Sequence, residues 1–154
     1  MAIQKTVQSQ YQQIVDHAAE AARGISAPKE GWIRTTRKAL GMTGTQLAQR
    51  MGISKAQVSQ TEKGEAGGSV TIKTMEKAAA ALGCRFVYAV VPETMTADLI
   101  NRRAREKARN IVEKVNEHMA LEAQTLSSEQ ISFEIDRLQG EFVQGKPGDL
   151  WNDE

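Results

Sequence analysis

The sequence has little of what catalytic and metal centres are usually built from. Its 154 residues include one cysteine and two histidines, and only 5% of them are aromatic. The single Cys84 cannot form a disulfide within the chain or a zinc site of clustered cysteines, and it fits a reducing compartment. His17 and His118 stand apart from each other and from Cys84 in the sequence. We therefore expect no metal, no cofactor and no enzyme activity.

Proline and long apolar runs are also scarce. Three prolines and few aromatic residues favour a mainly α-helical protein. No apolar run has the length that a bilayer requires, and residues 1–6 do not have the form of a signal peptide. We expect a cytoplasmic, nucleoid-associated bacterial protein.

The net charge of +1 hides an uneven distribution along the chain. Residues 29–64 carry seven basic side chains against two carboxylates, which gives a net charge of +5. Residues 111–154 carry three basic side chains against ten carboxylates, a net charge of −7. The basic segment suits a partner rich in phosphates, and the acidic one is either kept away from DNA or is ordinary helix surface.

The stretch between Gly44 and Lys63 has the spacing of a helix-turn-helix. Ala48 is small at the point where two helices must cross, and Gly52 follows where the turn needs a positive φ. Val58 comes six residues later, on the face of the second helix that packs back. The inward face also includes Leu47, Met51 and Ile53. This pattern predicts a second helix that lies in the major groove of DNA.

Residues 31–83 extend this motif into a known type of domain. They contain Gly31-Trp-Ile-Arg34 and Leu40-Gly-Met-Thr43 before the motif, and Ala81-Leu-Gly83 after it. The segment resembles the DNA-binding domain of the phage-repressor-like (Xre/Cro) family, which implies a five-helix bundle and a sequence-specific regulator. Gly44 departs from that family, which has a phosphate-binding glutamine there; the backbone N–H groups of the helix start can still bind phosphate.

The resemblance assigns DNA contacts position by position. The base-reading positions on the recognition helix are Lys55, Ala56, Ser59 and Gln60. Lys55 can donate to guanine, Gln60 can pair with adenine, and Ala56 can meet a thymine methyl. Positions for phosphate contact, or else for plain surface, are Thr43, Gly44, Arg34, Arg37, Lys38, Arg50, Ser54, Gln57 and Lys63. We expect Thr43, Ser54 and Thr71 to cap helices, Glu62 to have a structural role and Trp32 to be a core anchor.

Residues 84–91 change from helical spacing to an alternation with period two. β-Branched and aromatic residues dominate this run, and Pro92 ends it. It is the only strand candidate in the chain, and a lone strand leaves its backbone groups unpaired. Pairing with the same strand of a second subunit would satisfy them and make a two-fold dimer. The predicted interface consists of Phe86, Val87, Tyr88 and Val90.

The flanking segments are predicted to be helical. Apolar spacing indicates helices at residues 6–23 and 96–123, and Ser127 begins a last helix that ends near Gly145. We therefore divide the chain into an N-terminal helical extension (1–28), an Xre/Cro-like helix-turn-helix domain (29–83), a dimerisation strand (84–92) and a C-terminal helical extension (93–154).

A second resemblance covers nearly the whole chain. Its residues are Gly31-Trp-Ile-Arg34, Cys84-Arg-Phe-Val-Tyr-Ala-Val-Val-Pro92, His118-Met-Ala-Leu-Glu-Ala-Gln124 and Leu150-Trp-Asn-Asp153. They resemble the family called mobile mystery protein A, which implies a Fic-domain protein as gene partner. The resemblance implies an autorepressor that is the antitoxin-like member of a toxin–antitoxin pair. The alternative is a protein that neutralises a Fic enzyme with little or no specific DNA binding.

One further pattern depends on the implied Fic partner. Inhibitors of Fic enzymes carry a serine or threonine followed, four residues on, by glutamate and glycine or asparagine, all on a helix. Ser26, Glu30 and Gly31 match these letters. A glutamate before glycine is equally what the entry to a helix looks like. Inhibition through Glu30 and an ordinary helix start therefore remain alternatives.

Overall fold

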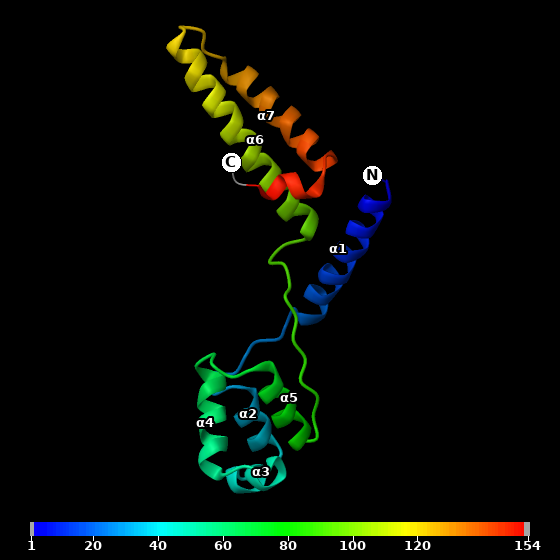
Figure 1. Ribbon diagram of the computed structural model, residues 1–154, viewed down its shortest axis with the longest axis vertical. Helices are drawn as coiled ribbons and strands as arrows, with labels where there is room; N and C mark the ends of the chain where they lie inside the picture. The colour runs from blue at the N-terminus through cyan, green and yellow to red at the C-terminus, as the bar shows by residue number, and fades with distance from the viewer. Residues whose placement is uncertain (1, 153–154) are drawn as a thin grey trace. The chain divides into compact units, whose positions relative to one another are not determined.

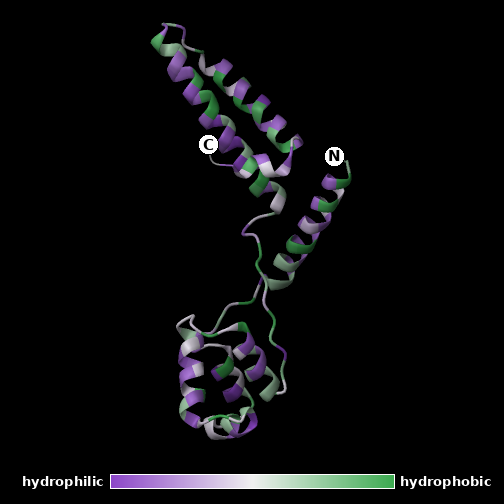
Figure 2. Cartoon of the chain, viewed as in Figure 1, coloured by the Kyte–Doolittle hydropathy of each residue, from purple (hydrophilic) through white to green (hydrophobic). Residues whose placement is uncertain are grey.

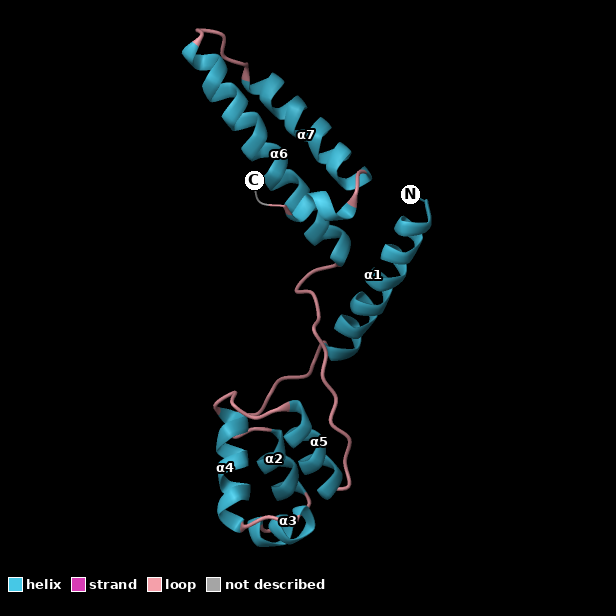
Figure 3. Cartoon of the chain, viewed as in Figure 1, coloured by secondary structure: helices cyan, strands magenta, loops and turns pink. Residues whose placement is uncertain are grey.

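The computed structural model describes residues 2–152, and these residues are almost entirely helical (Figures 1 and 3). Within this range there are seven α-helices, one 3₁₀ helix and no strand. Two compact units are present: residues 22–90 form one, and the chain before and after them forms the other. None of the described helices is long and apolar enough to cross a membrane.

Residues 22–90 contain a bundle of four helices that contact one another around one core. They are α2 (Trp32–Ala39), α3 (Gly44–Met51), α4 (Lys55–Ala66) and α5 (Ile72–Ala81). Leu47, Ala48 and Val58 are buried, as the helix-turn-helix pattern predicted, and Met51 and Ile53 pack against them. The rest of the core is Ile33, Met75, Ala78 and Leu82.

The bundle differs from the sequence expectation in two respects. It has four helices where five were implied, because the described chain after Leu82 is extended and forms no helix before Thr96. Trp32 is 42% exposed and is not a core anchor, whereas the next residue, Ile33, is 4% exposed. A helix turns about 100° per residue, so Trp32 points away from the direction in which Ile33 meets the core.

The helix starts in the bundle follow the predicted caps. Thr43, Ser54 and Thr71 each accept a hydrogen bond from the backbone N–H three residues on. At Thr43 and Ser54 the glutamine at that position also accepts from the cap residue's own N–H, which completes a capping box. Gly52 ends α3 at φ 69°, the left-handed conformation that the turn requires. These local contacts define the helix-turn-helix before any long-range packing.

Helix α2 begins without a cap of its own. Gly31 has no side chain, and the carboxylate of Glu65, in the last turn of α4, accepts from Trp32 N at 2.6 Å and Ile33 N at 2.9 Å. Gly31 has φ 83°, and a Cβ there would lie 2.8 Å from the Glu65 carboxylate. Glycine is therefore needed at position 31 for both the backbone conformation and the close approach of Glu65.

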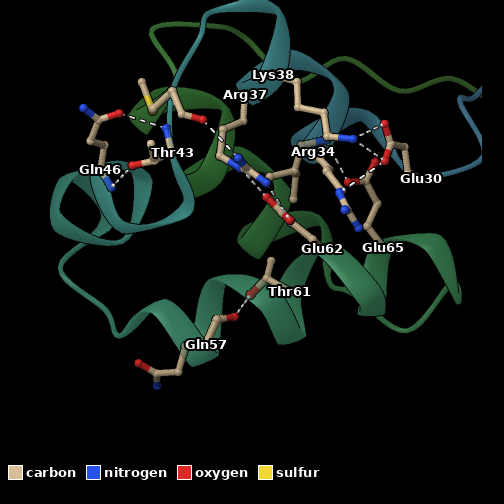
Figure 4. A network of polar contacts seen from close by, with 12 residues as sticks. Glu30, Arg34, Arg37, Lys38, Thr43, Gln46, Gln57, Thr61, Glu62 and Glu65 are labelled. Atoms are coloured by element: carbon tan, nitrogen blue, oxygen red, sulfur yellow. Dashed lines mark hydrogen bonds and ion pairs between the residues drawn. The ribbon is translucent and has the colours of Figure 1, made fainter.

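A buried ion pair joins α2 to α4 (Figure 4). Arg37 donates from Nε to Glu62 Oε1 at 2.6 Å and from Nη2 to Oε2 at 3.2 Å, and a third bond reaches the Met42 carbonyl oxygen at 3.0 Å. The two side chains are only 14% and 9% exposed. The Glu62 hydrogen bond raises the pKa of Arg37 above its usual range. The expected structural role of Glu62 agrees with this arrangement.

Residues 84–91 are extended but form no strand within the described chain. Phe86 packs partly against the bundle core and stacks on the Tyr88 ring with centroids 5.8 Å apart. The other predicted interface residues project outward: Val87 is 63% exposed, Tyr88 68% and Val90 91%. A strand requires a partner for its ladder of hydrogen bonds, and no other described segment is extended beside it. Its pairing in a dimer stays a prediction.

The unit outside residues 22–90 contains a helical hairpin. Helix α6 (Thr96–Leu121) packs along α7 (Ser128–Gln144), with Ala108, Val112 and Ile135 buried between them. Ser127 caps α7 through a full capping box with Gln130, as predicted. The short turn is held by Asn116, whose side-chain oxygen accepts from Leu126 N at 3.0 Å. The two helices therefore form one antiparallel pair.

A short 3₁₀ helix, η1 (Pro147–Trp151), folds back on the base of this hairpin. Leu150 is 3% exposed, and Lys107 Nζ donates to the carbonyl oxygens of Asp149 at 2.6 Å and Asn152 at 3.0 Å. The Arg103 guanidinium lies 6.0 Å from the centre of the Trp151 ring. The apolar residues Leu150 and Trp151 are thus packed against α6.

Helix α1 (Ala2–Ala22) belongs to the same unit as this hairpin. It starts earlier than the predicted residue 6 and contains no buried residue. Its clearest attachment is Asp16, which accepts from Thr96 N at 3.0 Å and from Thr96 Oγ1 at 2.8 Å. Met95, at the cap position of α6, supplies no side-chain bond. Asp16 therefore caps α6 from a distant part of the sequence, as Glu65 caps α2.

We predict that Glu62→Ala destabilises the bundle by about 3 kcal/mol, because it leaves the Arg37 charge buried without its partner. Unfolding in urea, followed by tryptophan fluorescence in a Trp151→Phe background, reports on the bundle alone through Trp32. The matched control is Glu30→Ala, since Glu30 pairs with Arg34 and Lys38 at the surface. Exposed pairs contribute little, so this control should have a much smaller effect. Equal losses for both variants would contradict the structural role of the buried pair.

Candidate nucleic-acid interface

The four predicted base-reading residues lie together on one exposed face of α4. Lys55 and Ala56 form the first helical positions, and Ser59 and Gln60 follow one turn later. All four are exposed, and none forms a hydrogen bond or ion pair that involves its side chain within residues 2–152. This face therefore presents one cation, one amide and one hydroxyl to solvent, the groups that read base edges in a major groove.

The side of α4 that faces the bundle is fixed near both ends of the helix. Ser54 and Gln57 close its first turn, and Val58 is 2% exposed against the bundle core. In its second half Glu62 binds Arg37, and in its last turn Glu65 binds the start of α2. Figure 4 shows these carboxylates pointing from α4 toward α2, on the side away from Gln57. The outer face of α4 is therefore held rigidly without using its own side chains.

The start of α3 offers backbone groups instead of a side chain. Gly44 is the first residue of this eight-residue helix, next to Thr43 at the cap. The Thr43 hydroxyl is already bonded to Gln46 N at 3.2 Å, and the Gln46 side chain returns to Thr43 N at 2.8 Å. The N–H groups of Gly44 and Thr45 are not part of this box. They are the donors that the glycine at position 44 leaves accessible to a phosphate.

The predicted phosphate-binding cations differ in how free their side chains are. Arg37 is bound to Glu62 and largely buried, so the structure gives it a structural role in place of a phosphate contact. Arg34 and Lys38 pair with Glu30 at 3.2 Å and 2.8 Å but remain about half exposed. Arg50 donates to the Ala81 carbonyl oxygen at 2.5 Å, which ties the end of α3 to α5. Lys63 forms no ion pair among the described residues and stays exposed.

Two further predicted contacts also belong to the capping of α4. Ser54 accepts from Gln57 N at 3.1 Å, and the Gln57 side-chain oxygen accepts from Ser54 N at 2.9 Å. The Gln57 oxygen is therefore occupied, while its amide nitrogen still has protons to donate. Both residues remain exposed at the start of the recognition helix. Their contribution to a phosphate contact would come from groups that the capping box leaves unused.

A shallow depression of about 460 Å³ continues from the recognition helix onto α5. Gln57, Gln60 and Thr61 form its α4 wall, and Thr74 and Lys77 form its α5 wall. Sequence reasoning did not select Thr74 or Lys77, since nothing in the spacing of α5 relates it to α4. The only local signal was Thr71, the predicted cap that starts α5 at the edge of the same depression.

The remaining candidate positions lie apart from this face. Ser26 is in an irregular segment and Glu30 in a turn, so the helical presentation of the Fic-inhibitor pattern is not found here. The Lys38 hydrogen bond also holds the pKa of the Glu30 carboxyl below its usual range. Gly31 contacts Glu65 as described. Glu30 and Gly31 lie directly before α2, and the inhibitory role of Ser26, Glu30 and Gly31 stays a prediction. No group of three histidine, cysteine or carboxylate residues in the described chain could hold a metal ion.

The comparison with protein families agrees with this site. Residues 33–88 match the model of a family described as helix-turn-helix, of the Xre-like type. Such domains are typically non-enzymatic and bind DNA in transcription regulators. No curated protein and no solved structure matches the chain. The match covers about a third of the residues and includes the core of the bundle, the recognition helix and the extended segment through Tyr88.

Proposed function

We propose that this protein is a sequence-specific transcription regulator that lays α4 into the major groove of DNA. The observation that carries this proposal is the outer face of α4. Lys55, Ser59 and Gln60 are exposed there without partners in the chain, while Glu62 and Glu65 hold the opposite side of the helix. A reading helix that is rigid and has unpaired polar groups loses little freedom when it meets base edges.

The charge of the domain supports the same proposal. Residues 29–64 carry a net charge of +5, and the exposed part of it includes Lys55 and Lys63. Each DNA phosphate that a lysine or arginine neutralises releases counterions, so binding should weaken steeply as salt rises. Arg37 does not contribute to this term, because its charge is compensated by Glu62. The bacterial cytoplasm, at the nucleoid, is the compartment that this function implies.

We further propose that two copies bind an inverted-repeat operator through paired 84–91 segments. Val87, Tyr88 and Val90 are exposed next to a backbone that has no ladder partner in the described chain. Antiparallel pairing across a two-fold axis would satisfy these backbone groups and bury the apolar side chains together. Helix-turn-helix dimers place their half-sites about 34–36 Å apart, one turn of DNA. Phe86 would then link the paired segment to the bundle core.

The antitoxin-like role is a finer proposal and is carried by the resemblance to mobile mystery protein A. In that reading the chain represses its own operon and binds a Fic-domain partner. Apolar side chains with no cover in the described chain are compatible with a partner: Ile111 and Val115 on α6 are 37% and 49% exposed, and Phe133 on α7 is 67% exposed. The rival function is that of a protein that neutralises a Fic enzyme without specific DNA binding. Gly44 and Ala56 favour this alternative, because both are short residues at positions that would contact DNA.

The first test of DNA binding is selection of an operator from random duplexes by the full chain. We predict that Lys55→Ala and Gln60→Ala lower affinity for the selected operator by about tenfold or more, corresponding to one good base contact each. Affinity for random DNA should change much less. Fluorescence anisotropy titrations at several salt concentrations separate the two effects.

The matched control is Lys63→Ala, since Lys63 is exposed at the far end of the same helix and is assigned to phosphate. It should weaken operator and random DNA together and reduce the salt dependence by about one counterion. If Lys55→Ala and Gln60→Ala behave like this control, the base-reading face is misassigned. If selection yields no preferred sequence, the neutraliser is favoured over the regulator.

Val87→Pro tests the paired segment. Proline removes one backbone N–H from a ladder, so we predict that the dimer weakens and that tight binding to the inverted repeat is lost. Binding to a single half-site should be unchanged, because residue 87 lies outside the bundle helices. Sedimentation equilibrium measures the dimer. A Val87→Thr control keeps the N–H and β-branching and should dimerise normally; equal dimerisation of both variants would show that the subunits meet elsewhere.

The Fic partnership is tested by co-expression with the product of the adjacent gene, if that gene encodes a Fic domain. We predict a complex that survives gel filtration in mild salt, and a Phe133→Ser variant that binds more weakly because it removes a large exposed ring. Glu30→Gly should leave any enzyme inhibition unchanged, since Glu30 lies outside a helix. Absence of the complex would remove the physical basis of the antitoxin role without affecting DNA binding.

A further inference from the structure

Helix α1 has an apolar stripe that the described chain does not cover. The stripe consists of Ile3, Val7, Tyr11 and Ile14, which are 79%, 43%, 67% and 63% exposed. The spacing of four, four and three residues places them along one side of the helix. Figure 2 shows apolar patches that recur along this helix among hydrophilic ones. No other described helix exposes so many large apolar side chains in a single row.

The other side of α1 is the one that is partly covered. Gln8, Gln12, Val15 and Ala19 are half-buried, and Asp16 on this side binds the start of α6. The covered side thus carries both polar and apolar residues, while the four large apolar side chains of the stripe remain exposed. In an ordinary amphipathic surface helix such large apolar side chains pack on the core.

A helix in this situation needs a partner for its own stability. With 21 residues α1 is about 32 Å long, and it has no buried residue. Most helical stability in proteins comes from the packing of an apolar face against a partner. The Asp16 contact lies near the C-terminal end, so it does not compensate for the exposed stripe between Ile3 and Ile14.

We propose that the stripe pairs with the same stripe of a second copy of this chain, which makes α1 a dimerisation helix. The charge around the stripe selects this occupant. Residues 2–15 contain five glutamines and a single charged residue, Lys5, which is six residues from Tyr11 and off the stripe. Two copies can therefore approach without like-charge repulsion, and the surrounding amides can hydrogen-bond across the interface. A partner of a different kind would be expected to be selected by charge, and this surface carries almost none.

This pairing of α1 extends the proposed function. Its two-fold geometry rests on the proposed dimer that binds an inverted repeat. A two-fold axis places identical surfaces opposite each other, as a self-complementary stripe requires. The 84–91 segment alone offers few side chains, and a stable interface buries about 800 Å² on each partner. The stripe of α1, which runs over about three turns, would supply additional apolar area. Two linked contacts between the same two copies would also raise the effective concentration of each.

The main test is the dimer dissociation constant of the full chain, measured by sedimentation equilibrium. Ile14→Glu places two carboxylates in the proposed interface and should raise the constant by about tenfold or more. Gln13→Glu is the matched control: it adds the same charge one residue away, about 100° around the helix and off the stripe, and should have little effect. Circular dichroism of both variants verifies that α1 stays helical.

Cysteine cross-linking provides a second readout that does not depend on stability. In a Cys84→Ser background, Val7→Cys, Tyr11→Cys and Ile14→Cys are oxidised separately, with Gln13→Cys as the control. At least one stripe position should form a disulfide-linked dimer, since the residue nearest the two-fold axis lies close to its own copy. The control should not cross-link.

The outcomes separate this inference from the proposed function. Unchanged dimerisation of Ile14→Glu together with no cross-link from any stripe position overturns the pairing of α1. Cross-linking of a stripe cysteine to Val115→Cys on α6 of a second copy, and not to itself, would also overturn it in favour of an exchanged helix. If the wild-type dimer cross-links through α1 but selects no operator, the pairing stands and the DNA-binding proposal fails.

Discussion

The position of the recognition helix α4 depends on two carboxylates on its inner side. Glu62 and Glu65 lie within one turn of each other on α4, and both side chains reach α2. Glu62 binds the Arg37 guanidinium, and Glu65 accepts from the free N–H groups at the start of α2. A buried carboxylate is stable only where opposite charge or several donors compensate it. These two contacts therefore fix where α4 can lie relative to α2.

This constraint determines the chemistry of the outer face. Because the inner side of α4 is occupied by Val58 and the two carboxylates, the positions on the opposite side are left to solvent. Lys55, Ser59 and Gln60 have no intramolecular task, and they are the residues available to a ligand. The cations differ in the same way: Arg37 is bound in a buried ion pair, whereas Lys55 and Lys63 are exposed and unpaired among the described residues. Charge counting along the sequence cannot make that distinction.

A second recurring feature is the capping of a helix start by a residue that lies far away in the sequence. The cap positions of α2 and α6 are Gly31 and Met95, neither of which has a side-chain oxygen. In each case a carboxylate from another helix bonds the free N–H groups, Glu65 at α2 and Asp16 at α6. Helices that begin with their own Thr or Ser can form locally, whereas these two are fixed only after a second element has packed. Each unit thus has one helix whose start is specified by tertiary structure.

Much of the fold was determined by local sequence, for a physical reason that applies residue by residue. Thr43, Ser54, Thr71 and Ser127 cap their helices as predicted, because side-chain and backbone partners lie within four residues. Leu47, Ala48 and Val58 are buried as predicted, because the spacing of apolar positions fixes the inner face of a helix. The base-reading positions were assigned by the resemblance to the Xre/Cro family; the structure leaves them exposed, and their contact with DNA stays a prediction.

Only the tertiary structure decided the contacts between residues far apart in the sequence. The pairing of Arg37 with Glu62, the approach of Glu65 to Gly31 and the outward position of Trp32 all depend on how helices meet, which periodicity does not encode. The run 84–91 has the composition of a strand, but a ladder needs a second backbone, and none of the described chain provides one. The sequence by itself therefore determined which face of each bundle helix is apolar. Packing decided which polar groups are paired within the chain and which remain free to bind.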